Sequence, residues 1–152
     1  MKNLGNPADQ QEVLDRLAAI RPNSPRRWGK MTAPQMVCHV NDSFHLATGD
    51  KYASPASSVL HRTVVKWFAL RVPLPWPRGF PTRPEMDQRI GGTPPVEFER
   101  DVQSLRNTVE RFTRPQRDFD WHPHPIFGHL TAAEWMRWGY LHMDHHLRQF
   151  GE

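Results

Sequence analysis

The stretch that decides the fold spans residues 134–150 and reads EWMRWGYLHMDHHLRQF. It is typical of the last helix of a small helical bundle. His142 and His146 are four residues apart, so both imidazoles lie on one face of that helix. Trp135 and Trp138 fall on the same stripe, which indicates that this face points into the bundle, where water is scarce. Two histidines so placed can occupy two coordination positions of a metal ion.

Three further stretches show the apolar periodicity of amphipathic helices. The first begins at Asn6-Pro7, an N-cap followed by proline at the first helical position, and continues to about residue 20. The second begins at the capping box Thr32-Ala-Pro-Gln35 and ends near Gly49. The third is expected to start at Thr93-Pro94-Pro95 and to end at Arg114-Pro115. It carries a clean apolar seam formed by Phe98, Val102, Leu105, Val109 and Phe112.

The region between the second and third of these helices is less regular. Residues 50–55 form a polar loop in this interpretation, and residues 56–71 form a shorter helix. The shorter helix is indicated by Leu60, Val64, Trp67, Phe68 and Arg71. The prolines of residues 73–84 exclude both helix and sheet interior. We therefore expect an extended segment there, held over the surface by Trp76 and Phe80.

A second capping box, Thr131-Ala-Ala-Glu134, precedes the last helix. The sequence contains neither an alternating strand pattern of useful length nor an internal repeat. It therefore predicts an all-α fold with four main helices in a bundle. An extra short helix and a Pro-rich excursion lie between helices 2 and 3. We expect one domain over residues 1–152, since this length is typical of a single domain.

Composition limits the classes of function. No run of about 18 apolar residues is present, and the first residues lack the apolar core of a signal peptide. With the single cysteine, Cys38, this favours a cytoplasmic protein without a disulfide or a membrane partner. The net charge of +4 comes mostly from scattered arginines, without basic runs or basic–aromatic alternation. A basic surface is therefore favoured over nucleic-acid binding.

The nine histidines are not equivalent. His39 lies near the start of the second helix and borders its apolar stripe, so it is expected to approach the core. His145 is turned about 100° from His146 around the helix and should point to a neighbour or to solvent. The others lie on weaker stripes or in loops: His45, His61, His122, His124 and His129.

A histidine pair at this spacing is more often structural or exposed than ligating. The third histidine and the tryptophan-lined stripe favour a metal site formed by His39, His142 and His146. Three neutral imidazoles from two helices would leave a divalent ion with open positions for water and substrate. Such a ligand set suits zinc, nickel, iron and copper alike, so the sequence does not choose the ion.

Five segments of the sequence carry a resemblance to a known family: Trp28-Gly-Lys-Met31, Gln35-Met-Val-Cys-His39, His124-Pro-Ile-Phe-Gly128, Glu134-Trp135 and His142-Met-Asp-His-His-Leu-Arg-Gln149. They resemble the DinB-like superfamily, and more narrowly an uncharacterised branch of it. The resemblance covers nearly the whole chain. It implies an up-down-down-up four-helix bundle that is often dimeric. It also implies a metal site built from one histidine of the second helix and an H-x-x-x-H pair of the last, positions that His39, His142 and His146 match.

Some members of this superfamily transfer low-molecular-weight thiols such as bacillithiol or mycothiol, or isomerise thiol adducts, and many members have no known activity. An open coordination position suits this chemistry because it can lower the pKa of a bound thiol, and it could equally activate water for hydrolysis. We therefore expect a zinc, nickel or iron enzyme, a thiol S-transferase or a hydrolase, acting on a small molecule and forming a homodimer. The alternative is a metal- or ligand-binding bundle without catalysis.

Several neighbours of these histidines have two interpretations. Gln35 and Asp144 could support the ligands, but a capping role for Gln35 and a solvated face for Asp144 are favoured. Trp135 and Trp138 could line a substrate pocket, although core packing is the more frequent role of such residues. Cys38 has no obvious partner, so a small buried thiol is favoured over a nucleophile.

Overall fold

The computed structural model describes residues 1–79 and 81–152, so Phe80 and its expected anchoring role lie outside the described residues. Within these residues the chain forms five α-helices and no strand, which confirms the all-α prediction. The helices are α1 (Pro7–Ala19), α2 (Ala33–Thr48), α3 (Lys66–Arg71), α4 (Phe98–Thr113) and α5 (Ala132–Gln149). A π-helical turn, η1 (His61–Val65), leads into α3, and a 3₁₀ turn, η2 (Pro84–Met86), follows the Pro-rich segment. None of the helices described is long and apolar enough to cross a membrane.

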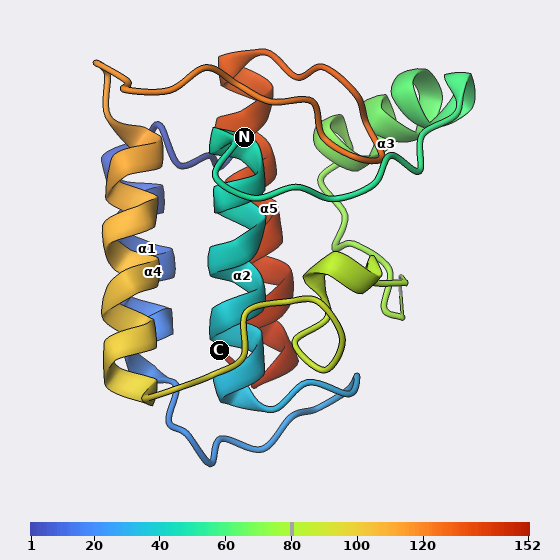
Figure 1. Cartoon of the computed structure of the whole chain (residues 1–152). Coiled ribbons are helices and arrows are strands. Elements are labelled where there is room, and N and C mark those ends of the chain that lie inside the picture. The colour runs from blue at the N-terminus through green and yellow to red at the C-terminus, as the bar shows by residue number, and fades with distance from the viewer. Residues whose placement is uncertain (80) are drawn as a thin grey trace.

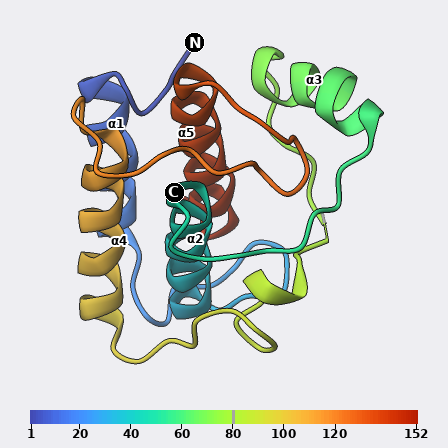
Figure 2. The same ribbon diagram turned by 45° about the horizontal axis from the view of Figure 1, so that its top comes forward.

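The four longer helices lie side by side, and α3 stands off to one side of them (Figures 1 and 2). Glu12 of α1 contacts Tyr140 of α5, and Arg16, one turn later on α1, contacts Asp144, one turn later on α5. These two helices therefore run in the same direction. Helices α2 and α4 run together in the opposite direction (Figure 1). The long connection between α2 and α4 carries α3, the Pro-rich segment and η2 along one flank of α2 and α5.

The expected helix ends are confirmed where a local motif sets them. The side chain of Asn6 accepts a hydrogen bond from the backbone of Ala8 at the start of α1. Both capping boxes form, at Thr32 before α2 and at Thr131 before α5. Gly49 ends α2 in the left-handed conformation, with a φ of 83°, which favours glycine.

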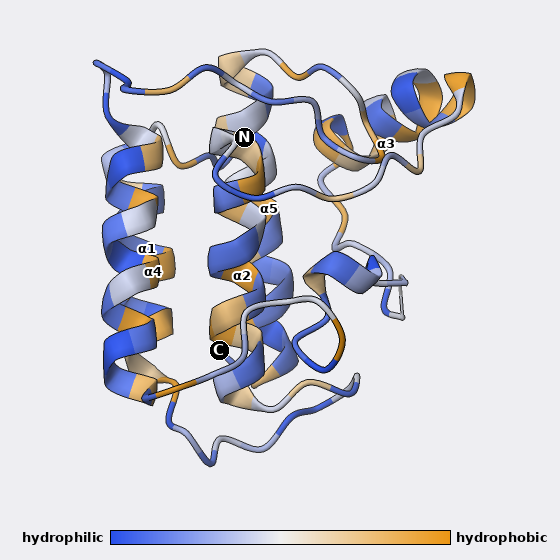
Figure 3. Cartoon of the chain, viewed as in Figure 1, coloured by the Kyte–Doolittle hydropathy of each residue, from blue (hydrophilic) through white to orange (hydrophobic). Residues whose placement is uncertain are grey.

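The core lies between the four long helices, where their apolar faces meet (Figure 3). Leu105, Val109 and Phe112 of the α4 seam are fully buried, and the Phe112 ring meets Phe44 of α2 edge to face at 4.7 Å between centroids. Full burial of a side chain of this size stabilises the fold by about 1.5–3 kcal/mol. This tight core holds α2 and α5 in a fixed register, which positions the side chains they share.

Two expectations for helix starts are wrong. Helix α4 begins at Phe98 rather than at Thr93, because the backbone and hydroxyl of Thr93 bind the Asp42 carboxylate instead. The shorter helix begins at residue 59 rather than at about residue 56, and the π-helical turn η1 follows its first two residues. Trp76 does anchor the Pro-rich segment, since its indole N–H donates to the carbonyl of Ala69 at 2.9 Å.

Candidate metal centre

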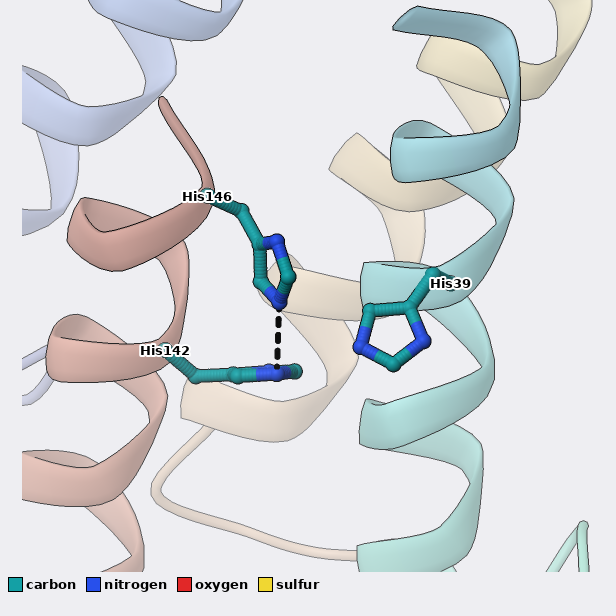
Figure 4. Close-up of side chains that lie close together, drawn as sticks. All are labelled: His39, His142 and His146. Atoms are coloured by element: carbon teal, nitrogen blue, oxygen red, sulfur yellow. Dashed lines mark hydrogen bonds between the residues drawn. The ribbon is translucent and has the colours of Figure 1, made fainter. Parts of the chain in front are cut away.

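Three histidines from two helices meet inside the protein. His39 lies on α2 and His142 and His146 on α5, and each is 6–9% exposed. One ring nitrogen of each lies within 4.8 Å of those of the other two (Figure 4). The Nε2 atoms of His142 and His146 are 3.2 Å apart. A tetrahedral ion with bonds of 2.0–2.1 Å to imidazole places its ligand nitrogens about 3.3 Å apart, so this spacing fits a shared ion.

The tautomer of His39 is set by a backbone carbonyl. Its Nδ1 lies 2.9 Å from the carbonyl oxygen of Met86, which can only accept a hydrogen bond. Nδ1 therefore carries the proton of the neutral ring. The lone pair of His39 is then on Nε2, which is the arrangement that a metal ligand requires.

The tautomer of His146 is set by Gln149 in a similar way. The Gln149 amide N–H donates to the carbonyl of Trp28 at 2.9 Å, which fixes the amide orientation. Its oxygen Oε1 then faces His146 Nδ1 at 3.2 Å and accepts a hydrogen bond from the N–H of that nitrogen. His146 therefore presents an unprotonated Nε2 to His142.

His142 is held by packing instead of a hydrogen bond. The Trp138 ring stacks on it at 4.7 Å between centroids, with an angle of 24° between the planes. Its Nδ1 is buried and has no hydrogen-bond partner in the part of the chain that the structure describes. Because the facing Nε2 of His146 is a lone pair, His142 must either donate to it or share a cation with it. A bound cation removes the repulsion between the two lone pairs.

Burial keeps these rings neutral. It lowers the pKa of His39, an effect that the hydrogen bond to Met86 and the charges of Asp42 and Asp87 oppose. The pKa values of His142 and His146 lie well below the ordinary value, because burial is reinforced by neighbouring histidines. Neutral imidazole is the form that binds metal, so protons compete weakly for this site.

The segment that carries Met86 is fixed to α2 by a buried carboxylate. Asp42 accepts hydrogen bonds from the backbone and the hydroxyl of Thr93 at 2.8 and 2.7 Å and from Gln88 at 3.2 Å. Lys51 pairs with the same carboxylate at 3.0 Å. Asp42 lies one turn from His39 on α2, so one helix positions both the histidine and the loop that orients it.

A cavity of about 310 Å³ opens above the three histidines. Its walls are mostly apolar and come from α3, the Pro-rich segment and the loop before α5: Val65, Phe68, Ala69, Val72, Leu74, Pro75, Trp76, Ile126 and Phe127. Polar lining comes from the histidines, Ser43, Thr82 and Arg83. The Arg83 guanidinium donates to the Ser54 hydroxyl, and its Nε has no partner among the described residues. The site therefore combines a cluster of lone pairs with an apolar chamber.

Two lining histidines were not expected at the site. His145, which we predicted to face a neighbour or solvent, lines the cavity together with Trp76. His124 is buried there, and its Nδ1 accepts hydrogen bonds from the backbone of Ile126 and Phe127, both at 3.1 Å. Burial lowers the pKa of His124 to about 3, so the ring is neutral and its proton is on Nε2. The only sequence clue to His124 was the His124-Pro-Ile-Phe-Gly128 segment that contributed to the family resemblance.

The candidate supporting residues have other roles. Gln35 serves the capping box, as favoured, because its side chain accepts from the backbone of Thr32. Asp144 is partly buried and forms ion pairs with Arg16 of α1 and with Arg148 of its own helix, instead of lying on the solvated face that was favoured. Neither residue contacts the histidine cluster through these bonds, whereas Gln149 and the Met86 carbonyl do.

The two tryptophans and the cysteine also differ in role. Trp135 is fully buried in the core, whereas Trp138 packs in the core and also lines the cavity beside His142. Cys38 is buried, and burial together with the nearby charge of Asp101 raises the pKa of its thiol to about 12. Such a thiol stays protonated at neutral pH, which agrees with its interpretation as an inert core residue.

Comparison with known proteins adds one family. The model of a family described as protein of unknown function (DUF1569) matches residues 6–152. No curated protein and no solved structure matches the chain.

Proposed function

Since the chain belongs to the family described as protein of unknown function (DUF1569), we propose its function from the site itself: it is a metal-dependent enzyme that acts on a small, largely apolar molecule. One observation carries this proposal. One ring nitrogen from each of three buried histidines converges with the other two at the wall of a cavity whose other walls are mainly apolar. A metal site that served only the fold would have no need of a chamber beside it.

The proposal extends to the fold. We assign the four long helices to the up-down-down-up bundle of the DinB-like superfamily, in one domain over residues 1–152. The shared direction of α1 and α5, and the opposite direction of α2 and α4, support this assignment (Figure 1). The position of α3 and the Pro-rich segment between the second and third long helices supports it as well. A cytoplasmic homodimer remains part of the same proposal.

In this proposal His39, His142 and His146 hold a divalent ion of zinc, nickel or iron. The ion would supply a Lewis acid with open positions, at which the pKa of a thiol or of water is lowered. The Met86 carbonyl and Gln149 keep Nδ1 of His39 and of His146 protonated, so that Nε2 of each ring faces the site. Partners of this kind typically change metal affinity by about 10–100-fold.

The cavity supplies the substrate preference. Its apolar walls favour a molecule with an apolar body, because burial of such a body is the main source of affinity in a pocket of this kind. The Nε2–H of His124 and the guanidinium of Arg83 are the donors that would orient a polar end. A thiol adduct with an apolar substituent and a small apolar ester both match this description, and they correspond to transferase and hydrolase activity.

The first test is the metal content of protein purified without an affinity tag, since a histidine tag or a nickel column would contaminate the result. We expect one equivalent of metal in the unmodified chain and in His129→Ala, whose side chain is exposed. We expect less than a tenth of an equivalent of metal in His142→Ala, because the two remaining histidines hold a divalent ion far more weakly than the full set of ligands does. A chain that takes up no zinc, nickel or iron would contradict the proposal.

The second test separates catalysis from binding. The metal-loaded protein is assayed with apolar thiols plus an electrophile and with small apolar esters, next to His142→Ala and His129→Ala. Turnover that is absent in His142→Ala and retained in His129→Ala supports the enzyme. Stoichiometric metal without turnover on either panel would assign the chain to the alternative, a metal- or ligand-binding bundle without catalysis.

A further inference from the structure

Residues 59–78, which we call the α3 arm, project from the four long helices (Figures 1 and 2). Six of the large apolar side chains of the arm are 55–71% exposed: Val59, Leu60, Val64, Trp67, Phe68 and Leu74. Among the described residues only four other large apolar side chains are exposed, and they are scattered along the chain: Met1, Tyr52, Ile90 and Val96. The apolar stripe that indicated a helix in the sequence is therefore largely turned outward. Figure 3 shows hydrophobic segments along the arm.

An outward apolar stripe of this kind requires an explanation. In a chain of this size the core already has buried apolar residues in all four long helices. Leu60, Val64, Trp67 and Phe68 recur at helical spacing, so they form one continuous strip instead of isolated exposed residues. Contiguous exposed apolar surface marks an interaction site more often than scattered residues do.

The charge of the same region identifies its partner. Residues 51–84 contain six basic residues and no aspartate or glutamate: Lys51, Arg62, Lys66, Arg71, Arg78 and Arg83. Since the whole chain has 20 basic and 16 acidic residues, the remainder has 14 basic and 16 acidic residues. The net positive charge of the protein is thus concentrated around the arm, and its partner should be negatively charged.

Several of these cations are available to a partner. Arg62 and Arg71 are exposed, and neither takes part in an ion pair within the described ranges 1–79 and 81–152. Lys66 is partly engaged by Glu134 at 3.3 Å, and the guanidinium of Arg78 lies over the Trp28 ring at 4.3 Å. Arg71 lies one turn after Trp67, at the end of the apolar strip, whereas the stem of Arg62 lies beside Gly128 in the loop before α5. Both are exposed positive charges without an ion pair among the described residues.

We propose that the α3 arm binds the surface of a membrane that contains anionic phospholipid. Trp67, Val64 and Leu60 enter the interface between head groups and acyl chains, and the exposed cations Arg62 and Arg71 are the residues available to the phosphates. Helices that lie in this interface combine tryptophan, phenylalanine and leucine on one face with arginine and lysine beside it. This departs from the sequence-based expectation of no membrane partner, which considered only segments that cross a bilayer.

A second copy of the chain is a poorer occupant of this surface. Two arms that pair about a two-fold axis would bring Arg62 and Arg71 of both copies together, with no acidic residue of residues 51–84 to separate them. Like charges across an interface oppose association. An anionic lipid surface removes this repulsion and covers the apolar strip at the same time. Phe68 and Leu74 also line the cavity of the candidate metal site, whereas Leu60, Val64 and Trp67 do not, so the inference is carried by these three.

The test is sedimentation of the full chain with vesicles of phosphatidylcholine and phosphatidylglycerol, and with vesicles of phosphatidylcholine alone. We expect binding to the mixed vesicles that weakens as salt is added. The double variant Val64→Ser, Trp67→Ser should bind at least about tenfold more weakly, because it removes two inserted side chains outside the cavity. The matched control is Ile90→Ser, Val96→Ser, which changes two equally exposed apolar residues outside the arm and should bind as the unmodified chain does.

The charge is tested by Arg62→Gln, Arg71→Gln, next to Arg114→Gln, Arg117→Gln as a control away from the arm. Each arm cation should contribute about fivefold in vesicle affinity, since a basic residue near an anionic surface contributes about 1 kcal/mol. Circular dichroism and thermal unfolding show whether each variant is folded, and only folded variants are compared. Equal binding of the arm and control variants, or no binding of the folded protein to mixed vesicles, would overturn the proposal.

Two further outcomes would assign the arm to another partner. If the protein does not bind vesicles but forms dimers that light scattering shows to be lost in Val64→Ser, Trp67→Ser, the arm binds a second copy. If it ignores vesicles but is retained on immobilised polyglutamate through Arg62 and Arg71, the partner is an acidic polypeptide. Either result would replace the lipid surface as the occupant.

Discussion

The carboxylate of Asp42 accepts two hydrogen bonds from Thr93, one from its backbone at 2.8 Å and one from its hydroxyl at 2.7 Å. Asp42 is 3% exposed, so these bonds are made away from water. They attach the segment after η2 to α2, and that segment brings the carbonyl of Met86 to His39. The orientation of one candidate ligand thus depends on a residue that contacts no part of the candidate site itself.

Asp42→Asn should weaken metal binding while the helices persist. Asparagine presents one oxygen in place of two and cannot accept from Thr93, Gln88 and Lys51 together. The Met86 carbonyl is then less well fixed, and we expect a loss of about tenfold in zinc affinity, as for other residues that orient a ligand. Competition with a chromogenic chelator measures it. Asp118→Asn, which alters an exposed ion pair with Arg111, is the control and should leave the affinity unchanged.

Gly29→Ala should act on His146 through Gln149. Gly29 has a φ of 81°, in the region that favours glycine, and a Cβ at this position would overlap the side-chain amide of Gln149. The strained backbone costs about 1–2 kcal/mol of folding free energy. The displaced amide would release Nδ1 of His146, so zinc affinity should fall as well. Gly79→Ala carries the same backbone cost, with φ at 79°, and should keep its affinity, because no described residue other than its chain neighbours lies within 4 Å of the added Cβ.

The parts of the fold that local chemistry specifies could be predicted from the sequence. The two capping boxes and Asn6 satisfy backbone N–H groups within a few residues, so they mark helix starts without knowledge of the tertiary structure. The approach of His39 to His142 and His146 was also predictable, because each lies beside an apolar stripe that must face the core. Whether the three hold a metal stays a prediction.

Features that depend on long-range contacts could not be predicted. The acceptor for His39 is the Met86 carbonyl, a backbone group that leaves no mark in the sequence. Helix α4 begins at Phe98 instead of the predicted Thr93, because Asp42 of another helix binds Thr93. The stripe of Trp67 and Phe68 indicates a helix equally well whether it faces the core or solvent, so its exposure appears only in the tertiary structure.

Gly139→Ala should destabilise the core, although alanine is the better helix former by about 1 kcal/mol. A Cβ on Gly139 would lie 2.7 Å from Leu4 Cδ1, 3.1 Å from a Phe44 ring carbon and 3.3 Å from a Phe112 ring carbon. Both rings are fully buried and cannot move aside freely. Overpacking of this kind costs about 1–3 kcal/mol, so we expect a net loss of about 1 kcal/mol in urea unfolding. An increase in stability would show that α5 can shift within the bundle.

His124 should make the stability of the protein sensitive to acid. Its pKa is about 3 in the folded chain against 6.5 for an ordinary histidine, because the ring is buried. As pH falls below 6.5, the unfolded chain takes up a proton that folded His124 does not accept until pH approaches 3. The free energy of unfolding contributed by this residue therefore falls by about 1.4 kcal/mol per pH unit across that window and is fully present only above it.

The variant that tests this is His124→Asn, because asparagine does not titrate and can still accept hydrogen bonds from Ile126 and Phe127. It should reduce the fall in stability between neutral and mildly acidic pH, as measured by urea unfolding in the presence of a chelator. His129→Asn, at an exposed site, should leave the slope unchanged, and equal slopes for all three proteins would mean that His124 is accessible to protons in the folded state.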